Sequence, residues 1–303
     1  EVGRIIGIPL PLHLTIIFIV LFIALSFANS SQSTSSIIYG FGGIEPAEVR
    51  WFFSLLLALI LFACVALHEL GHSYIALRNG IGIKSITLYF FGGVAAMEEI
   101  PRNPSLELKM AFAGPAVSGI LGLAFWLAGR EIVSYLGISH PLSIMLSNLG
   151  LMNLILMAFN LLPAFPMDGG RLLRAWFAFH MPYVKATRRA SDIGKIFATV
   201  MFLLGLASLN FMLLFVAFFV YVGASEEEKA TEISISLEGI TVRDIMSSPV
   251  ESVPPDMTLD ELKELMFRDK HRGYPVMESG KLEGMVTITD LEMVAPERRV
   301  WAR

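Results

Sequence analysis

Three ionisable residues, His68, Glu69 and His72, form an H-E-x-x-H motif inside a long apolar stretch. In residues 51–77 no other side chain is readily charged at neutral pH. Positions i and i+4 share one face of a helix, so both imidazoles can bind one metal ion while Glu69 acts on a metal-activated water. A single histidine on an apolar helix is usually a core residue, but three ionisable groups in a membrane-spanning segment are costly and mark function. The motif therefore predicts a zinc site that activates water.

A catalytic zinc site of this kind needs one more protein ligand, and Asp168 is the best candidate. It stands in N-L-L-P-A-F-P-M-D-G-G, residues 160–170, more than twenty residues from the next acidic side chain on either side. Pro163 and Pro166 cannot continue a regular helix, and irregular backbone at membrane depth must be covered by protein or line a water-filled cavity. The alternative is that Asp168 merely caps a helix over residues 170–177.

The elements that must position these residues are membrane helices. Of the 303 residues, 54% are hydrophobic and only 17% are charged, against about 25% in soluble domains. This composition predicts an integral membrane protein with the lipid bilayer as its surroundings. A net charge of −4 gives no indication of nucleic-acid binding, and one cysteine, Cys64, excludes an intrachain disulfide.

Six apolar runs are long enough to span a bilayer. They cover residues 11–28, 51–77, 106–129, 142–165, 191–208 and 209–224. Six spans place both termini on one side. Within residues 1–228, that side and the adjoining span ends carry eleven Lys and Arg residues, whereas the other side carries only Arg50 and Arg130. The positive-inside rule then predicts cytoplasmic termini and an active site toward the cytoplasmic side of the cell membrane.

Residues 81–98 separate the second and third apolar runs and have strand propensity. Ile86, Thr87 and Tyr89 favour a strand, and Gly92-Gly93 favours a turn. A hairpin here could hold an extended peptide by β-strand addition. The alternative, a loop whose aromatic side chains pack on the helices, is equally compatible with the sequence.

The two motifs, HELGH at 68–72 and NLLPAFPMDGG at 160–170, resemble the site-2 protease family of zinc intramembrane metalloproteases. Every fixed position of that family's H-E-x-x-H and N-x-x-P-x-x-P-x-D-G-G patterns is present, and FGG at 91–93 and AGP at 113–115 match further family features. The resemblance covers about residues 5–225. One departure is Ser118, where several branches carry Asn, and no catalytic role is assigned to it.

The resemblance implies a role for each site residue. His68, His72 and Asp168 would bind one Zn²⁺ per chain, and Glu69 would be the general base. Asn160 is similar to the family asparagine that positions substrate or stabilises the oxyanion. Its alternative role is a hydrogen bond between helices. The family also implies regulated intramembrane proteolysis of single-span membrane proteins.

Residues 229–303 are richer in charge than residues 1–228, which predicts a small soluble domain after the membrane domain. Thr258 can cap a helix that begins at Leu259, and strands are expected at 273–277 and 282–288. The segment resembles one CBS motif. Since such motifs pair, a single one implies either a truncated chain or a homodimer through the CBS domains.

In the CBS family, the positions matching Thr287 and Asp290 often contact the ribose and phosphates of an adenine nucleotide. The resemblance therefore implies nucleotide binding at these residues. The alternative is that Asp290 caps the following helix and the domain binds nothing.

We therefore expect an α-helical integral membrane protein of about six spans followed by a small α/β CBS-like domain. Its expected function is hydrolysis of peptide bonds in or near transmembrane segments, with adenine nucleotides as regulators. The alternative is a zinc transporter that uses His68, His72 and Asp168 as a transit site. A transporter would carry polar residues in both halves of the bilayer and often an internal repeat, and neither is evident.

Overall fold

The computed structural model describes residues 4–5, 8–9, 14–33, 38–89, 92–97 and 102–294. The chain divides into two compact units, residues 1–236 and 237–303, which are considered separately below. The junction expected between residues 228 and 229 falls inside helix α7 (Phe211–Ser236), because that helix continues through the acidic run without a break.

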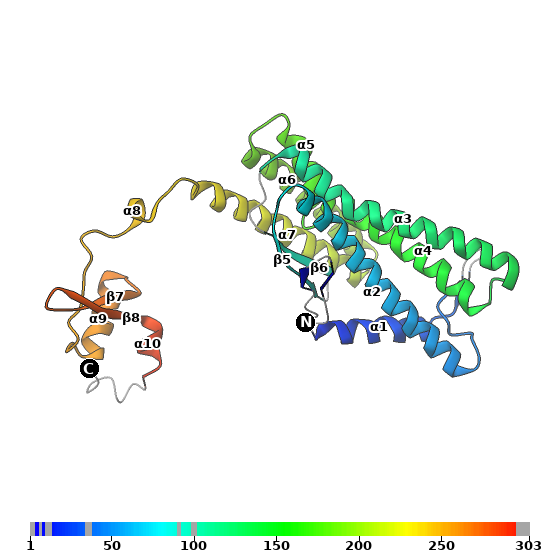
Figure 1. Cartoon of the computed structure of the whole chain (residues 1–303), viewed down its shortest axis with the longest axis horizontal. Coiled ribbons are helices and arrows are strands. Elements are labelled where there is room, and N and C mark those ends of the chain that lie inside the picture. Colours follow the sequence, from blue (N-terminus) through cyan, green and yellow to red (C-terminus); the bar gives the residue numbers. More distant parts are fainter. Residues whose placement is uncertain are drawn as a thin grey trace. The chain divides into compact units, whose positions relative to one another are not determined.

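The first unit is built mainly of helices (Figure 1). Those of its described part are α1 (Thr15–Asn29), α2 (Ala47–Arg78), α3 (Pro104–Leu136), α4 (Pro141–Asn160), α5 (Asp168–Ala178), α6 (Tyr183–Ala207) and α7. Its short strand pairs are β1 (Arg4–Ile5) with β2 (Ile8–Pro9) and β3 (Gln32–Ser33) with β4 (Ile38–Tyr39).

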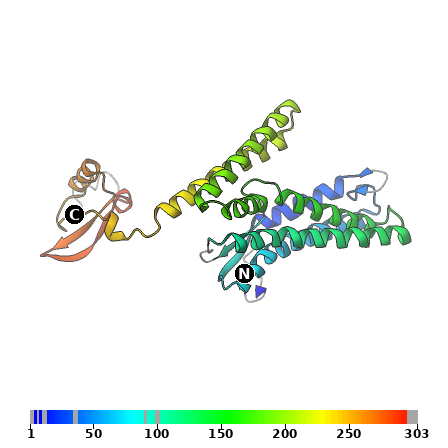
Figure 2. The ribbon, with the colours of Figure 1, turned by 90° about the horizontal axis from the view of Figure 1, so that it is seen from above.

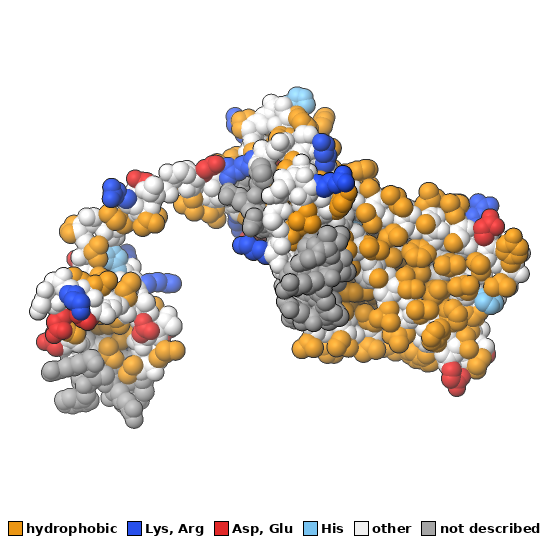
Figure 3. Space-filling model, in the orientation of Figure 1, with side chains coloured by type: hydrophobic (Ala, Val, Ile, Leu, Met, Phe, Trp, Pro, Cys, Tyr) orange, Lys and Arg blue, Asp and Glu red, His pale blue; other side chains and the backbone are white. Residues whose placement is uncertain are grey.

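Four of the described helices, α2, α3, α4 and α6, are long and apolar enough to cross a membrane. Six spans were expected. The run at 11–28 yields α1, whose 15 residues fall short of the roughly 20 that a perpendicular span needs. The apolar part of α7 runs directly into Glu226, Glu227 and Glu228. Hydrophobic side chains cover most of the visible face of the helical unit (Figure 3), which is the surface that a bilayer requires.

The helices form two groups that α5 connects. α3 and α4 pack along each other and against α2, while α6 and α7 form an antiparallel pair that both views show (Figures 1 and 2). Phe27 of α1, Leu57 of α2 and Leu149 of α4 share one buried core. The short helix α5 contacts both α3 and α6, so its first residue, Asp168, lies where the two groups meet.

A β-hairpin lies against the helix that carries the H-E-x-x-H motif. Strands β5 (Ile83–Tyr89) and β6 (Gly92–Met97) pair antiparallel, and both contact α2. Of the two alternatives that the sequence left open, a hairpin or a loop, the backbone forms the hairpin. Gly92 and Gly93 belong to β6 and pair with β5, so they are not the turn. The turn residues 90–91 and the side chains of 86–97 lie outside the description.

In the second unit a helix is followed by two strands, as the CBS resemblance predicts, and a shorter helix lies on each side of them in the sequence. Its elements are α8 (Val242–Ile245), α9 (Leu259–Asp269), β7 (Gly273–Glu278), β8 (Lys281–Thr287) and α10 (Ile288–Glu292). Thr258 caps α9 as expected: its hydroxyl accepts from the Glu261 N–H. Leu262 and Met266 of α9 are buried against Tyr274 of β7, which closes a small core.

Candidate metal centre

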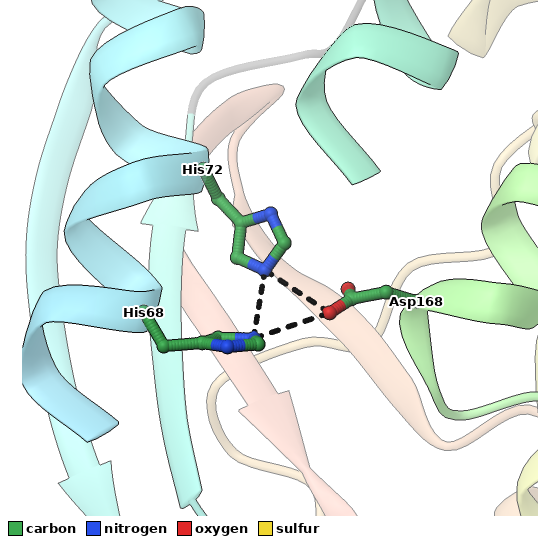
Figure 4. A group of neighbouring side chains, drawn as sticks. All are labelled: His68, His72 and Asp168. Atoms are coloured by element: carbon green, nitrogen blue, oxygen red, sulfur yellow. Dashed lines mark hydrogen bonds and ion pairs between the residues drawn. The ribbon is translucent and has the colours of Figure 1, made fainter. Parts of the chain in front are cut away.

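Two histidines one helical turn apart on α2 meet an aspartate from α5 (Figure 4). The Nε2 atoms of His68 and His72 are 3.2 Å apart, and Oδ2 of Asp168 lies 3.2 Å from each of them. All three side chains are buried. Within the described part of the chain, this is the one cluster of three His, Cys, Asp or Glu residues whose donor atoms converge closely enough to hold a metal ion.

The irregular segment between α4 and α5 places Asp168. Helix α4 ends at Asn160, earlier than the apolar run suggested, because Pro163 and Pro166 lack the N–H groups that a continuing helix needs. Asp168 is the first residue of α5, and the N-cap Met167 makes no side-chain capping bond. The alternative in which Asp168 caps a helix starting at residue 170 is therefore wrong, and its carboxylate faces the imidazoles instead.

Gly169 allows α5 to start so close to the segment before it. A Cβ atom at this position would lie 2.1 Å from the carbonyl oxygen of Leu162 and 2.5 Å from that of Leu161. Real Cβ atoms do not approach backbone so closely, so a side chain here would push the first turn of α5 away. The glycine after Asp168 therefore fixes the position of the carboxylate.

Both imidazoles are held by bonds from their Nδ1 atoms to α3. Nδ1 of His72 donates to the carbonyl oxygen of Met110 at 2.7 Å, which leaves the Nε2 lone pair of the neutral ring directed at the cluster. Nδ1 of His68 lies 2.8 Å from Oγ of the fully buried Ser118. Such outer bonds orient metal-binding histidines. Ser118, to which the sequence assigned no role, thus contacts a candidate ligand.

Gly114 brings α3 directly against the two imidazoles. A Cβ atom at this position would lie 2.2 Å from Nε2 of His72 and 2.6 Å from Nε2 of His68. The A-G-P segment therefore needs a glycine at its centre, because only glycine leaves space where the donor atoms converge. The sequence pattern alone did not give this reason.

The arrangement fits a zinc ion. Zinc binds nitrogen and oxygen ligands at about 2.0 Å, so neighbouring ligand atoms in a tetrahedral site are about 3.3 Å apart. The three separations of 3.2 Å match that value. Two imidazoles and one carboxylate also form a donor set typical of catalytic zinc with one open position.

Glu69 and Asn160, the other site residues predicted in this unit, differ in their contact with the cluster. The half-buried Glu69 is close enough for its carboxylate to be acted on by the charges of His68, His72 and Asp168. Asn160 donates its amide to the Leu156 carbonyl oxygen of its own helix at 3.0 Å, so neither a contact with the cluster nor a bond between helices is seen for it.

A cavity of about 160 Å³ opens beside His72. It contains a buried charge network that the sequence did not predict: the Arg174 guanidinium bonds Glu107 of α3 and Glu227 of α7. The cavity is lined by His72, Glu107, Met110, Ala111, Arg171, Arg174, Tyr183 and Glu227.

Thr287 and Asp290 form a capping box at the start of α10. The Thr287 hydroxyl donates to Oδ2 of Asp290 at 2.6 Å, and the Asp290 N–H donates back to the hydroxyl oxygen at 3.4 Å. The Thr287 hydroxyl, together with the Thr287 backbone N–H that donates to the same Oδ2 at 2.8 Å, holds the pKa of the Asp290 carboxyl below its usual value. The geometry supports the capping alternative.

The fold and the site together define a membrane metallohydrolase. Residues 56–138 and 131–208 match peptidase family M50, and residues 242–295 match the CBS domain. A zinc metalloprotease of Methanocaldococcus jannaschii is 40% identical over 95% of this chain and 78% of its own length. Rip3 of Mycobacterium tuberculosis, assigned to the zinc metalloproteases, is 32% identical over 98% of this chain and 76% of its own length.

Among solved structures, the site-2 protease from Methanocaldococcus jannaschii has a TM-score of 0.51 and 39% identity over 75% of this chain and 94% of that chain. The chain belongs to peptidase family M50. It is a zinc metalloprotease of the site-2 protease type that carries a CBS domain, and these relatives give no support to the transporter alternative.

Proposed function

We propose that this metalloprotease hydrolyses peptide bonds within or near the transmembrane segments of single-span membrane proteins. One observation carries the proposal: the cluster of His68, His72 and Asp168 is buried in a unit whose outer surface is apolar. A substrate that reaches such a site must itself enter a bilayer.

His68, His72 and Asp168 are the proposed ligands of Zn²⁺. When bound there, the ion would supply Lewis acidity and lower the pKa of a water molecule toward about 7. Glu69 takes the proton of the attacking water and passes it to the leaving amine. Asn160 donates its amide to the developing oxyanion, which requires its side chain to leave the Leu156 carbonyl oxygen.

The test is cleavage of single-span reporter proteins by the purified chain, compared with Glu69→Gln. Loss of product with retained zinc is the expected result. Glu131→Gln removes an exposed carboxylate from α3 and serves as the matched control. Equal cleavage by the wild type and Glu69→Gln would place the base elsewhere.

The β5–β6 hairpin is the proposed surface that holds the substrate extended. A substrate helix must unwind locally before hydrolysis, and a strand edge beside α2 can bond the unwound backbone. Val94→Pro, within β6, should then lower the rate of reporter cleavage more than it lowers the affinity for zinc. Equal losses of both would mean that the hairpin has only a structural role.

The proposed orientation has both termini and the active site toward the cytoplasm. The uneven distribution of Lys and Arg supports it. In intact cells, an impermeant maleimide should label Ser31→Cys without lysis and His180→Cys only after lysis. The reverse pattern would invert the topology.

Adenine nucleotide binding at Thr287 and Asp290 is the proposed regulation. The match of residues 242–295 to the CBS domain supports it, and Asp290 is exposed to solvent. Thr241→Val is a matched control, because Thr241 forms the same kind of capping box with Asp244. Thr287→Val should weaken binding of AMP to the full chain while Thr241→Val does not; equal affinities would end the nucleotide proposal.

A homodimer through the CBS domains is the proposed assembly. The second unit leaves large apolar side chains exposed, among them Phe267 at 69% and Met285 at 67%. Large apolar side chains left exposed on so small a unit are compatible with an interface. Phe267→Asp should convert a detergent-solubilised dimer to a monomer, as measured by mass photometry, and a wild-type monomer would contradict the assembly.

A further inference from the structure

The cavity beside His72 has one wall made by the candidate metal site. His72 and Met110, whose carbonyl oxygen accepts from the His72 ring, both line it. At about 160 Å³ the cavity is comparable to engineered cavities of about 150 Å³ that admit benzene, so it has room for one side chain or chain terminus. A peptide bound at the metal site would therefore have an adjoining pocket for one of its groups.

Two arginines line this cavity, and one of them, Arg174, is already bound to other side chains of the protein. Its Nε atom donates to Oε1 of Glu107 at 2.7 Å, and its Nη1 atom bonds Glu227. The guanidinium also packs over the rings of Phe165 and Tyr183, with distances to the ring centroids of 5.1 and 5.0 Å. Because two carboxylates already outnumber its single positive charge, Arg174 has no net charge left to offer a ligand carboxylate.

Arg171 differs from Arg174 in each of these respects. It lies one turn after Asp168 and one turn before Arg174 on α5, it is exposed, and it lines the same cavity. In the described part of the chain, its guanidinium has no hydrogen bond or ion pair. Because Arg171 follows Asp168 by one helical turn, its charge is close to the proposed reaction centre.

We propose that this cavity is a substrate subsite that accepts a carboxylate through Arg171. The planar guanidinium can bond both oxygens of a carboxylate, and partial enclosure strengthens that contact relative to open water. Glu107 and Glu227 also line the cavity; Arg174 bonds both of them and balances one of their two negative charges, and Arg171 brings the formal charge of the four groups to zero. The subsite deepens the proposed proteolytic function and rests on it.

The carboxylate can come from two sources. One is an aspartate or glutamate side chain near the scissile bond of the intact substrate. The other is the α-carboxylate that hydrolysis creates at the end of the N-terminal product. The first source would select substrates, and the second would slow product release.

Direct binding to the purified full chain distinguishes the two sources. Three fluorescent peptides of one sequence are compared by anisotropy: a peptide acid, a peptide amide with one aspartate, and the same amide with asparagine in place of the aspartate. We expect one or both carboxylate peptides to bind about five times more tightly than the neutral amide, within the range of partly exposed charged contacts. Arg171→Gln should remove that ratio and Arg171→Lys should retain part of it.

Arg189→Gln is the matched control, because it removes the same charge from an exposed arginine on α6 that does not line the cavity. Equal binding of all three peptides by the wild type would overturn the subsite, as would equal ratios in Arg171→Gln and Arg189→Gln. The reporter assay is separate: a chain that cleaves nothing refutes the proposed proteolysis, while the binding ratio still decides the subsite.

Discussion

The Nε and Nη2 atoms of Arg174 both reach one carboxylate oxygen of Glu107, at 2.7 and 2.6 Å. Both side chains are buried, at 7% exposure each. The pair ties α5, which carries Asp168, to α3, which holds the two imidazoles. The metal site is therefore assembled by contacts that lie outside the ligands themselves.

Removing one member of this pair should destabilise the first unit strongly. Arg174→Met leaves Glu107 buried without its partner, and losses of this kind cost about 3–5 kcal/mol. The double variant Arg174→Met with Glu107→Leu should recover part of the loss, because the charge that then remains unpaired, on Glu227, is partly exposed to solvent. Unfolding in detergent, followed by circular dichroism, measures both. Lys281→Gln breaks an exposed pair and should change stability by less than about 1 kcal/mol.

Ser118→Ala should weaken zinc binding about 10- to 100-fold with little change in fold, because the His68 ring loses the group that orients it. Competition with a zinc-sensitive chelator measures the affinity. Ser134→Ala, which alters an exposed serine of the same helix, is the control. Equal affinities in the two variants would show that Ser118 does not position His68.

Gly114→Ala should abolish zinc binding. The added methyl group would lie 2.2 Å from Nε2 of His72, which forces either the ring or the helix to move. Gly119→Ala on the same helix meets mainly the flexible end of Met157, at 2.7 Å, and should be tolerated. Metal content of the purified variants decides the matter, and a zinc-loaded Gly114→Ala protein would contradict the close approach.

The second unit should lose stability in acid through its capping boxes. Hydrogen bonds from Thr287 and Thr241 hold the pKa values of Asp290 and Asp244 below the usual value. The stabilisation is therefore complete above the unfolded value of about 3.9 and is lost as the pH falls through the lower folded values. The protection factors for hydrogen exchange near α10, which correct for the intrinsic pH dependence of amide exchange, should fall below about pH 4, and Asp290→Asn should lower them already at pH 7. A pH-independent wild type would contradict this.

The sequence predicted the residues that converge, but it did not predict what holds them. His68 and His72 follow from helical spacing, and Asp168 was the best candidate because acidic residues are rare around it. Ser118 and Gly114 of α3 contact the imidazoles because α3 packs against α2 at that point. No local sequence pattern predicts where two helices pack together. Their contacts required a structure.

Other expectations differed for local reasons. Pro163 and Pro166 indicate that a regular helix cannot continue, and α4 does end before them, at Asn160 rather than at residue 165, so that α5 begins at Asp168. The charge network of Arg174 joins three helices distant in sequence, so spacing could not reveal it. In the second unit, helix and strand order followed directly from caps and alternation, because those signals are local.

Helix α2 sets the depth at which the chemistry takes place. The apolar stretch of the helix begins at Trp51, and His68 lies 17 residues further along it. At 1.5 Å per residue this is a rise of about 26 Å, close to the roughly 30 Å thickness of a bilayer's hydrocarbon core. The first imidazole therefore stands toward one end of the apolar stretch and not at its middle. Water for hydrolysis would then have a short path from the nearer interface.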